Sequence, residues 1–115
     1  MRMIQGIEVH GSDVDAQTRC AHYRSEIDII AVKFKCCGRW FSCFECHAER
    51  ANHAPEVWSF AEFETRAVLC GNCGYQLTIA EYLNCDSLCP RCRRAFNPKC
   101  ANHYNLYFEI SAARD

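Results

Sequence analysis

The chain has 115 residues and a formal net charge of −1, a balance that excludes a strong electrostatic attraction to nucleic acid or anionic lipid. Its 11 cysteines far exceed an ordinary composition, and because the count is odd they cannot all pair in internal disulfides. No apolar run approaches the roughly 20 residues of a membrane span, and the acidic start lacks a signal-like segment. We therefore expect a protein without membrane association, in a reducing compartment, whose cysteines mainly bind metal.

The first predicted elements are strands. Residues 4–9 are expected to form a short strand. Residues 27–34 are rich in β-branched side chains, and residues 39–44 are expected to pair with them as a hairpin whose turn contains residues 36–38. Residues 43–53 then favour a short helix that ends before a proline.

Two capping boxes mark the next helix starts. In each, a hydroxyl and a carboxylate three residues apart can satisfy backbone amides that have no helical partner. The pairs are Ser59 with Glu62 and Thr78 with Glu81. Residues 104–110 alternate aromatic and polar side chains, which predicts a final strand. All of these elements are short, so something other than a large hydrocarbon core must hold them together.

The strongest motif is a pair of Cys-x-x-Cys turns. Cys70 and Cys73 form the first, Cys89 and Cys92 form the second, and 15 residues lie between them. Two residues between thiols make a tight turn that directs both sulfurs to one point, so the two turns can supply four thiolates to one tetrahedral zinc. Gly74 permits a left-handed conformation beside the first turn. Disulfides and a redox pair are the alternatives.

The first half of the chain holds a denser set of donors. Eight thiols and imidazoles are an economical count for two zinc ions. They are Cys20, His22, Cys36, Cys37, Cys43, Cys46, His47 and His53.

The adjacent cysteines Cys36 and Cys37 decide how these donors are expected to divide. Neighbouring residues of an extended chain point to opposite sides, so we expect the two thiols to bind different ions. The expected partition is Cys20, His22, one of these thiols and one helix histidine for one ion, and Cys43, Cys46, the other thiol and the other histidine for the second.

Three further residues are candidates of a weaker kind. Cys85 lacks a partner at ligand spacing and is expected to be a half-buried small apolar residue. Cys100 and His103 have ligand spacing and are possible additional metal ligands, but a buried cysteine and a histidine at a strand entry explain them equally well.

These motifs together resemble the CHY-type zinc finger family. The resemblance rests on "RCAHY", "CCGRWFSCFECHAE", "CGNCGYQLTIAEYL", "CPRC" and "FNPKCANHYNLYF", and covers about residues 4–110. It implies three zinc ions, held by Cys20, His22, Cys36, Cys37, Cys43, Cys46, His47, His53, Cys70, Cys73, Cys89 and Cys92. Relatives in ubiquitin ligases carry this module ahead of a RING finger, but the eight further ligands of a RING are absent from these residues, so we expect no ligase activity.

We therefore predict a small metal-stabilised α+β fold, with short hairpins and helices organised around about three structural zinc sites. No linker divides the sequence, so residues 1–115 are expected to form one domain. Within it, residues 18–58 would hold about two zinc ions, and residues 59–110 would hold the four-cysteine zinc.

The function expected first is that of a non-catalytic zinc-finger module that mediates interaction with an unidentified protein. Closed zinc shells leave no water to activate, so the chain is not expected to be an enzyme. The alternative is zinc handling, in which the chain exchanges metal with thiol proteins and assists their assembly. Resemblance to stand-alone family members suggests this alternative. We expect a cytoplasmic protein, or one of the mitochondrial intermembrane space if the source is eukaryotic.

Other functions are less well supported. "CPRC" has redox spacing but lacks the strand-to-helix context of a thioredoxin-like fold. No compact cysteine run of an iron–sulfur protein occurs. Arg91, Arg93 and Arg94 could face nucleic acid, but a solvated basic surface beside a zinc site explains them more simply, so nucleic acid is an unlikely partner.

Overall fold

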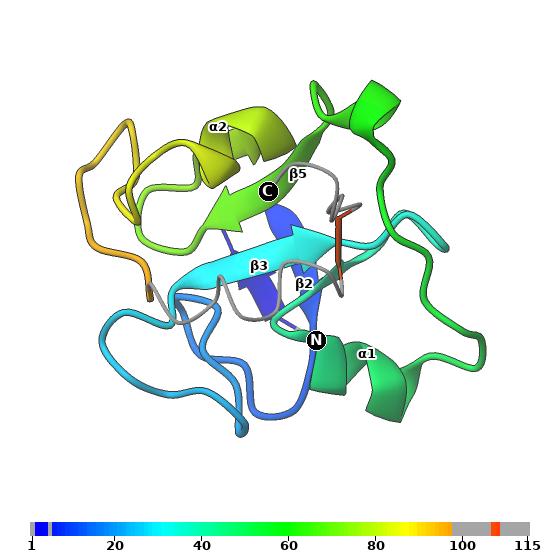
Figure 1. Cartoon of the computed structure of the whole chain (residues 1–115). Coiled ribbons are helices and arrows are strands. Elements are labelled where there is room, and N and C mark those ends of the chain that lie inside the picture. The colour runs from blue at the N-terminus through cyan, green and yellow to red at the C-terminus, as the bar shows by residue number, and fades with distance from the viewer. Residues whose placement is uncertain (1, 5, 98–106, 109–115) are drawn as a thin grey trace.

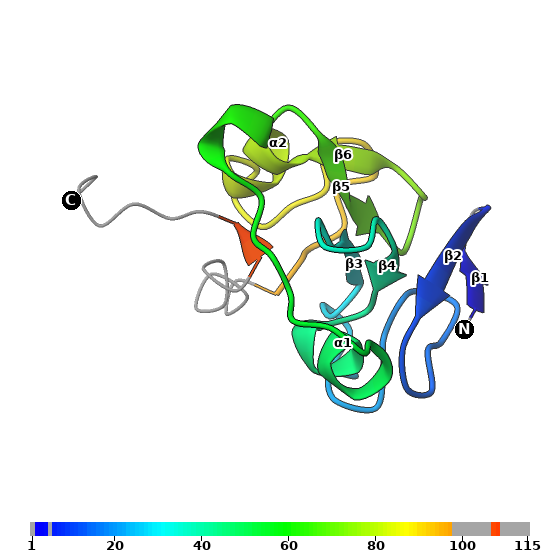
Figure 2. The same ribbon diagram turned by 90° about the vertical axis from the view of Figure 1, so that its right-hand side faces the viewer.

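The computed structural model describes residues 2–4, 6–97 and 107–108. Six strands form one sheet in the order β1-β2-β4-β3-β5-β6. Their bounds are β1 Arg2–Ile4, β2 Ile7–His10, β3 Ile30–Lys33, β4 Trp40–Phe41, β5 Arg66–Cys70 and β6 Gln76–Thr78. The β2–β4 pair is parallel, whereas the other four pairs are antiparallel. In both views β3 lies between the helices α1 (Phe44–Arg50) and α2 (Ile79–Leu83) (Figures 1 and 2).

The amino-terminal segment differs from the single strand that its sequence predicts. β1 and β2 form an antiparallel hairpin in which Ile4 is paired with Ile7. Gly6 has a φ of +83°, a left-handed conformation that glycine adopts at little cost, and this allows the tight reversal. The prediction of one strand over residues 4–9 was therefore wrong, because the weak alternation of apolar residues does not reveal the turn.

The central hairpin is confirmed. β3 and β4 are antiparallel, with Val32 opposite Phe41 and Lys33 opposite Trp40. On its other side β3 pairs with β5, placing Ile30 opposite Cys70. The sheet thus continues from the first half of the chain into the second.

The capping boxes also act as the sequence predicts. Thr78 Oγ1 accepts a hydrogen bond from the Glu81 backbone at 3.0 Å, and Glu81 Oε1 accepts one from the Thr78 backbone at 2.8 Å, which starts α2. Ser59 and Glu62 start a single 3₁₀ turn, Phe60–Glu62, instead of a longer helix. The predicted helix over residues 43–53 is shorter too: α1 has seven residues, and Cys43 caps its start.

The buried interior combines apolar side chains of the sheet, of α2 and of the connecting segments with buried cysteines. Phe41, Phe96 and Phe108 are among the largest fully buried side chains, and Cys46 and Cys70 are completely buried beside them. The predicted strand 104–110 lies largely outside the described residues, although Phe108 forms an isolated bridge with Trp58. In the part of the chain that is described, no helix has the length and apolarity needed to cross a bilayer.

Candidate metal centres

Among the residues that the structure describes, three groups of donor atoms each contain four side chains whose ligand atoms are all within 4.8 Å of one another. We name them by their thiols. The three-thiol cluster is Cys20, His22, Cys43 and Cys46. The two-thiol cluster is Cys36, Cys37, His47 and His53. The four-thiol cluster is Cys70, Cys73, Cys89 and Cys92.

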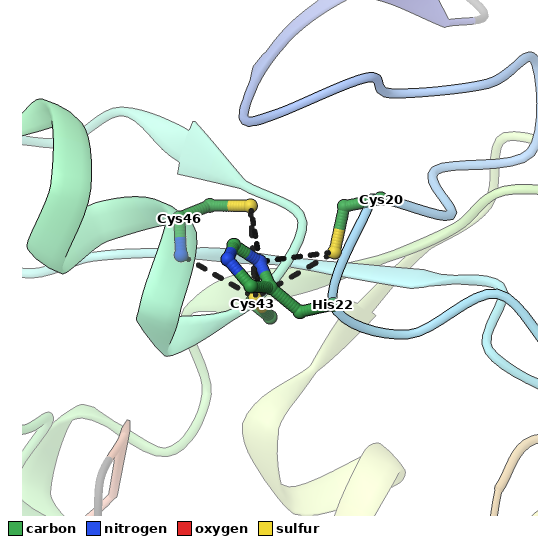
Figure 3. A group of neighbouring side chains, drawn as sticks. All are labelled: Cys20, His22, Cys43 and Cys46. Carbon is green, nitrogen blue, oxygen red and sulfur yellow. Dashed lines mark hydrogen bonds between the residues drawn. The ribbon is translucent and has the colours of Figure 1, made fainter.

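In the three-thiol cluster, one imidazole nitrogen faces the sulfurs. His22 Nδ1 lies 3.7 Å from Cys20 Sγ, 3.4 Å from Cys43 Sγ and 3.5 Å from Cys46 Sγ. Figure 3 shows the His22 ring directed between the Cys20 and Cys46 side chains. The loop before β3 supplies Cys20 and His22, whereas Cys43 and Cys46 come from the start of α1.

A carboxylate holds the other side of the His22 ring. Glu49 Oε2 lies 3.0 Å from His22 Nε2, and Ser12 Oγ donates a hydrogen bond to Glu49 Oε1 at 2.8 Å. The Glu49 hydrogen bond, followed by the contact with Cys20, raises the pKa of His22. Because an acceptor at Nε2 keeps the proton there, Nδ1 is left free to bind a metal ion.

The thiols of this cluster crowd one another. Interactions with Cys43 and then Cys46 lower the pKa of the Cys20 thiol, whereas the interaction with Cys20 raises the pKa of both other thiols. Three thiols in contact cannot all ionise readily unless a cation balances them. The site therefore has the chemistry of a divalent metal centre.

The two-thiol cluster is built around a turn and the end of α1. Cys36 Sγ lies 3.9 Å from Cys37 Sγ and 3.2 Å from the Nε2 atoms of both His47 and His53. The His47 ring is buried and stacks on Phe34 with ring centroids 4.2 Å apart. Burial, then the nearby charges of His53 and Arg39, lower its pKa, which favours the neutral form that binds metal.

The expected partition of the first eight donors was wrong. Cys36 and Cys37 lie in the same cluster, and the Cys20 and His22 pair shares its cluster with Cys43 instead. The prediction treated Cys36 and Cys37 as extended backbone, but both lie in the turn after β3. A turn rotates successive side chains by less than a strand does, so adjacent thiols can face one point.

The four-thiol cluster joins the two Cys-x-x-Cys turns. Cys70 Sγ lies 3.8 Å from Cys92 Sγ, and Cys73 Sγ lies 3.7 Å from Cys89 Sγ. Gly74 has a φ of +82°, the left-handed conformation that the sequence predicts.

Backbone and side-chain donors face these sulfurs. The backbone N–H groups of Arg91 and Cys92 each donate to Cys89 Sγ at 3.4 Å. Burial alone would raise the pKa of Cys92, but hydrogen bonds, the largest from the Asn72 side chain at 3.3 Å, lower it to about 6. The Cys92 thiolate is thus stabilised, whereas burial raises the pKa of the Cys70 and Cys73 thiols. A bound cation would favour the thiolate form of these two side chains.

The spacing of the donors fits zinc. A tetrahedron with Zn–S bonds of about 2.3 Å has edges of about 3.8 Å between sulfurs. Within each of the three clusters, the sulfur atoms that contact one another lie 3.6–3.9 Å apart. All ten described cysteines are free, so within the described residues disulfides do not account for these contacts. Thiolate and imidazole donors in sets of four are those of structural zinc sites.

The three weaker candidate ligands are not part of the clusters that the structure describes. The Cys85 thiol donates to the Tyr82 carbonyl at 3.2 Å and packs against the core, as expected of a half-buried apolar residue. Cys100 and His103 lie outside the described residues, so their part in metal binding stays a prediction.

Sequence reasoning missed the residues that support the ligands. Glu49 and Ser12 hold His22, while Gln17 Nε2 donates to Asn72 Oδ1 at 2.9 Å and so links the loop before β3 to the four-thiol cluster. The contacts of Glu49 with Ser12 and of Gln17 with Asn72 span 37 and 55 residues, and no local motif signals them.

The comparisons with known proteins agree with the clusters. The CHY zinc finger family matches residues 20–104. The chain is 41% identical over 104 residues to Helper of Tim protein 13 of Saccharomyces cerevisiae, covering 88% of this chain and 90% of that protein. It is 40% identical over 102 residues to the protein of the same name in Kluyveromyces lactis, covering 88% of each. An uncharacterized protein of Schizosaccharomyces pombe is 42% identical over 101 residues, again covering 88% of each chain. No solved structure matches this chain.

Proposed function

The chain belongs to the CHY zinc finger family, and from this premise we propose that it is a non-catalytic zinc-binding module that interacts with a protein partner. The observation that supports this most strongly is the set of three clusters, each with four donors. Four protein donors fill a tetrahedral zinc shell, so no position remains for a water that zinc could activate.

The proposed ligands are the twelve side chains of these clusters. We infer one domain over residues 1–115, in which residues 18–58 hold two zinc ions and residues 59–110 hold the third. The pairing of β3 with β5 supports a single unit, because one sheet connects the two regions. Zinc bound to these side chains would supply cross-links that the short strands and helices lack.

A protein partner is suggested by the relatives. Their name, Helper of Tim, describes proteins that help another protein. A helper role also fits the zinc-handling alternative, in which this chain exchanges metal with thiol proteins, and for that role we propose the mitochondrial intermembrane space rather than the cytoplasm as the location.

The test begins with metal content. Elemental analysis of the untagged, freshly isolated chain should find three zinc ions per molecule, and alkylation should find thiols that become accessible only after zinc removal. Fewer than three ions, or sulfurs bonded to one another, would contradict the proposal. The zinc-loaded chain should then bind its partner directly in purified form, whereas the chelated chain should not. Cys85→Ser serves as the control, because it removes a thiol outside the clusters.

A further inference from the structure

The three clusters differ in how far solvent can reach their ligands. Three of the four donors are buried in the three-thiol cluster, and two are buried in the four-thiol cluster. In the two-thiol cluster only His47 is buried. An incoming molecule therefore reaches the two-thiol cluster most easily.

The histidines of these clusters are held to very different degrees. His22 is clamped by the Glu49 carboxylate, and His47 is buried against Phe34. His53, in contrast, is exposed. Apart from its contacts within the cluster, it has one polar contact among the described residues: its Nδ1 lies 3.2 Å from the side-chain oxygen of its neighbour Asn52.

The segment that carries His53 has little to fix it. Residues 52–57 are all exposed, and among the described residues they form no backbone-to-backbone hydrogen bond. Burial raises the pKa of the Cys36 thiol, and a hydrogen bond from the Glu56 backbone opposes this shift. The Glu56 contact would keep the segment beside the cluster when the His53 ring turns outward. Movement of this one ring gives up an edge-on contact with the His47 ring, whose centroid lies 5.1 Å away, while His47 keeps its stacking on Phe34.

The net charge of each zinc site also favours exchange at the two-thiol cluster. Zinc carries two positive charges, so the two thiolates of this cluster neutralise it, whereas the three and four thiolates of the other clusters leave −1 and −2. A further thiolate is repelled by a negative centre but not by a neutral one. Attack by a thiol is therefore least opposed at the two-thiol cluster.

We propose that the two-thiol cluster is the zinc-exchange site of this protein, and that His53 is the ligand that leaves. As the His53 Nε2 bond to the metal breaks, the sulfur of an incoming thiol takes its place and the thiol proton passes to Nε2. The exchange needs no oxidant or reductant. This inference rests on the proposed zinc-binding function and specifies the site at which zinc handling would occur.

The first experiment distinguishes the three clusters by the number of thiolates that each one contributes. The full chain is loaded with ¹¹³Cd, whose NMR shift depends on the number of bound thiolates, so the three clusters give separate resonances. On stepwise addition of EDTA, the resonance of the two-thiol cluster should disappear first. In Asn52→Ala and His53→Ala its rate of loss should rise, by about tenfold or more for His53→Ala, while the other two resonances keep their rates. His10→Ala, which removes a histidine outside the clusters, should change none of them.

The thiol arm uses the zinc-loaded chain and two probes, glutathione and a Cys-x-x-Cys peptide, with native mass spectrometry as the readout. We expect the peptide to convert molecules with three zinc ions into molecules with two, and glutathione to do so more slowly. Loss from another cluster first, simultaneous loss from all, or loss to EDTA without transfer to either thiol would overturn the inference. A chain that never holds three ions would instead contradict the proposed function itself.

Discussion

At the scale of single residues, Gly71 shows how closely the four-thiol cluster is packed against the rest of the fold. Its backbone N–H donates to the Ile29 carbonyl at 2.6 Å. A Cβ at this position would overlap the Gln17 carbonyl and lie 2.9 Å from that of Ile29. These obstacles are backbone atoms, which cannot move aside as a flexible side chain can.

We therefore expect Gly71→Ala to lower the free energy of unfolding of the zinc-loaded protein by about 3 kcal/mol or more. Thermal unfolding followed by near-UV circular dichroism measures the loss. Gly6→Ala is the matched control, because Gly6 has a φ of +83° but no atom within 4 Å of the added Cβ. The control should lose only about 1–2 kcal/mol through backbone strain. Equal losses in the two variants would contradict the packing argument.

The role of Gly71 could not be predicted from the sequence. A glycine after the first cysteine of the turn is consistent with a tight turn, and Gly74 does have the predicted positive φ. Gly71 does not have a positive φ, and it is required because two distant segments touch its backbone. The sequence therefore indicates the ligands of this cluster, since their spacing is local, but not the long-range contacts that position them.

At the scale of elements, α1 connects two of the clusters. It has seven residues, and isolated helices shorter than about 12–15 residues are marginal in water. Cys46 points into the three-thiol cluster while the next residue, His47, points into the two-thiol cluster. Glu49, on the same helix, contacts Nε2 of His22, the ring nitrogen that faces away from the sulfurs. The helix is therefore expected to depend on both metal sites.

Glu49→Gln tests the part of this arrangement that orients His22. The amide is a weaker acceptor than the carboxylate, so we expect the metal affinity of the three-thiol cluster to fall about tenfold while the other clusters keep theirs. Competition with a colorimetric chelator, with the ¹¹³Cd resonances identifying the site, measures the change. Glu45→Gln removes the same charge from the same helix and should leave all three affinities unchanged. An unaltered affinity in Glu49→Gln would show that the contact does not position His22.

The elements also show where sequence reasoning succeeds. The Thr78 and Ser59 capping boxes and the β3–β4 hairpin were predicted, because each depends on residues close together in the chain. The division of Cys36 and Cys37 between two ions was not correct, because it assumed an extended backbone where the chain turns. The β1–β2 hairpin was missed for a similar reason, since a single glycine reverses the direction of the chain.

At the scale of the whole molecule, stability depends on the free energy of zinc binding relative to that of burying the apolar core. Structural zinc contributes an apparent 10–16 kcal/mol per ion in zinc-finger peptides at neutral pH, and domains have about 5–15 kcal/mol of net stability in total. The strands here have two to five residues, and several of the buried side chains are the proposed ligands themselves. Zinc is therefore expected to be indispensable to the fold.

Acid should consequently unfold the protein and release its metal in one process. Thiolates bound to zinc carry no proton, whereas unfolded thiols have a pKa of about 8.5, so the unfolded state binds more protons and stability falls as the pH falls. We expect cooperative loss of tertiary structure below about pH 5, with zinc released over the same pH range. Near-UV circular dichroism, which reports the packing of Trp40 and of the Tyr82–Phe96 ring pair, is recorded together with free zinc. EDTA at neutral pH provides the control and should give the same loss of signal. A chelated protein that kept its near-UV spectrum would show that the hydrocarbon core alone maintains the fold.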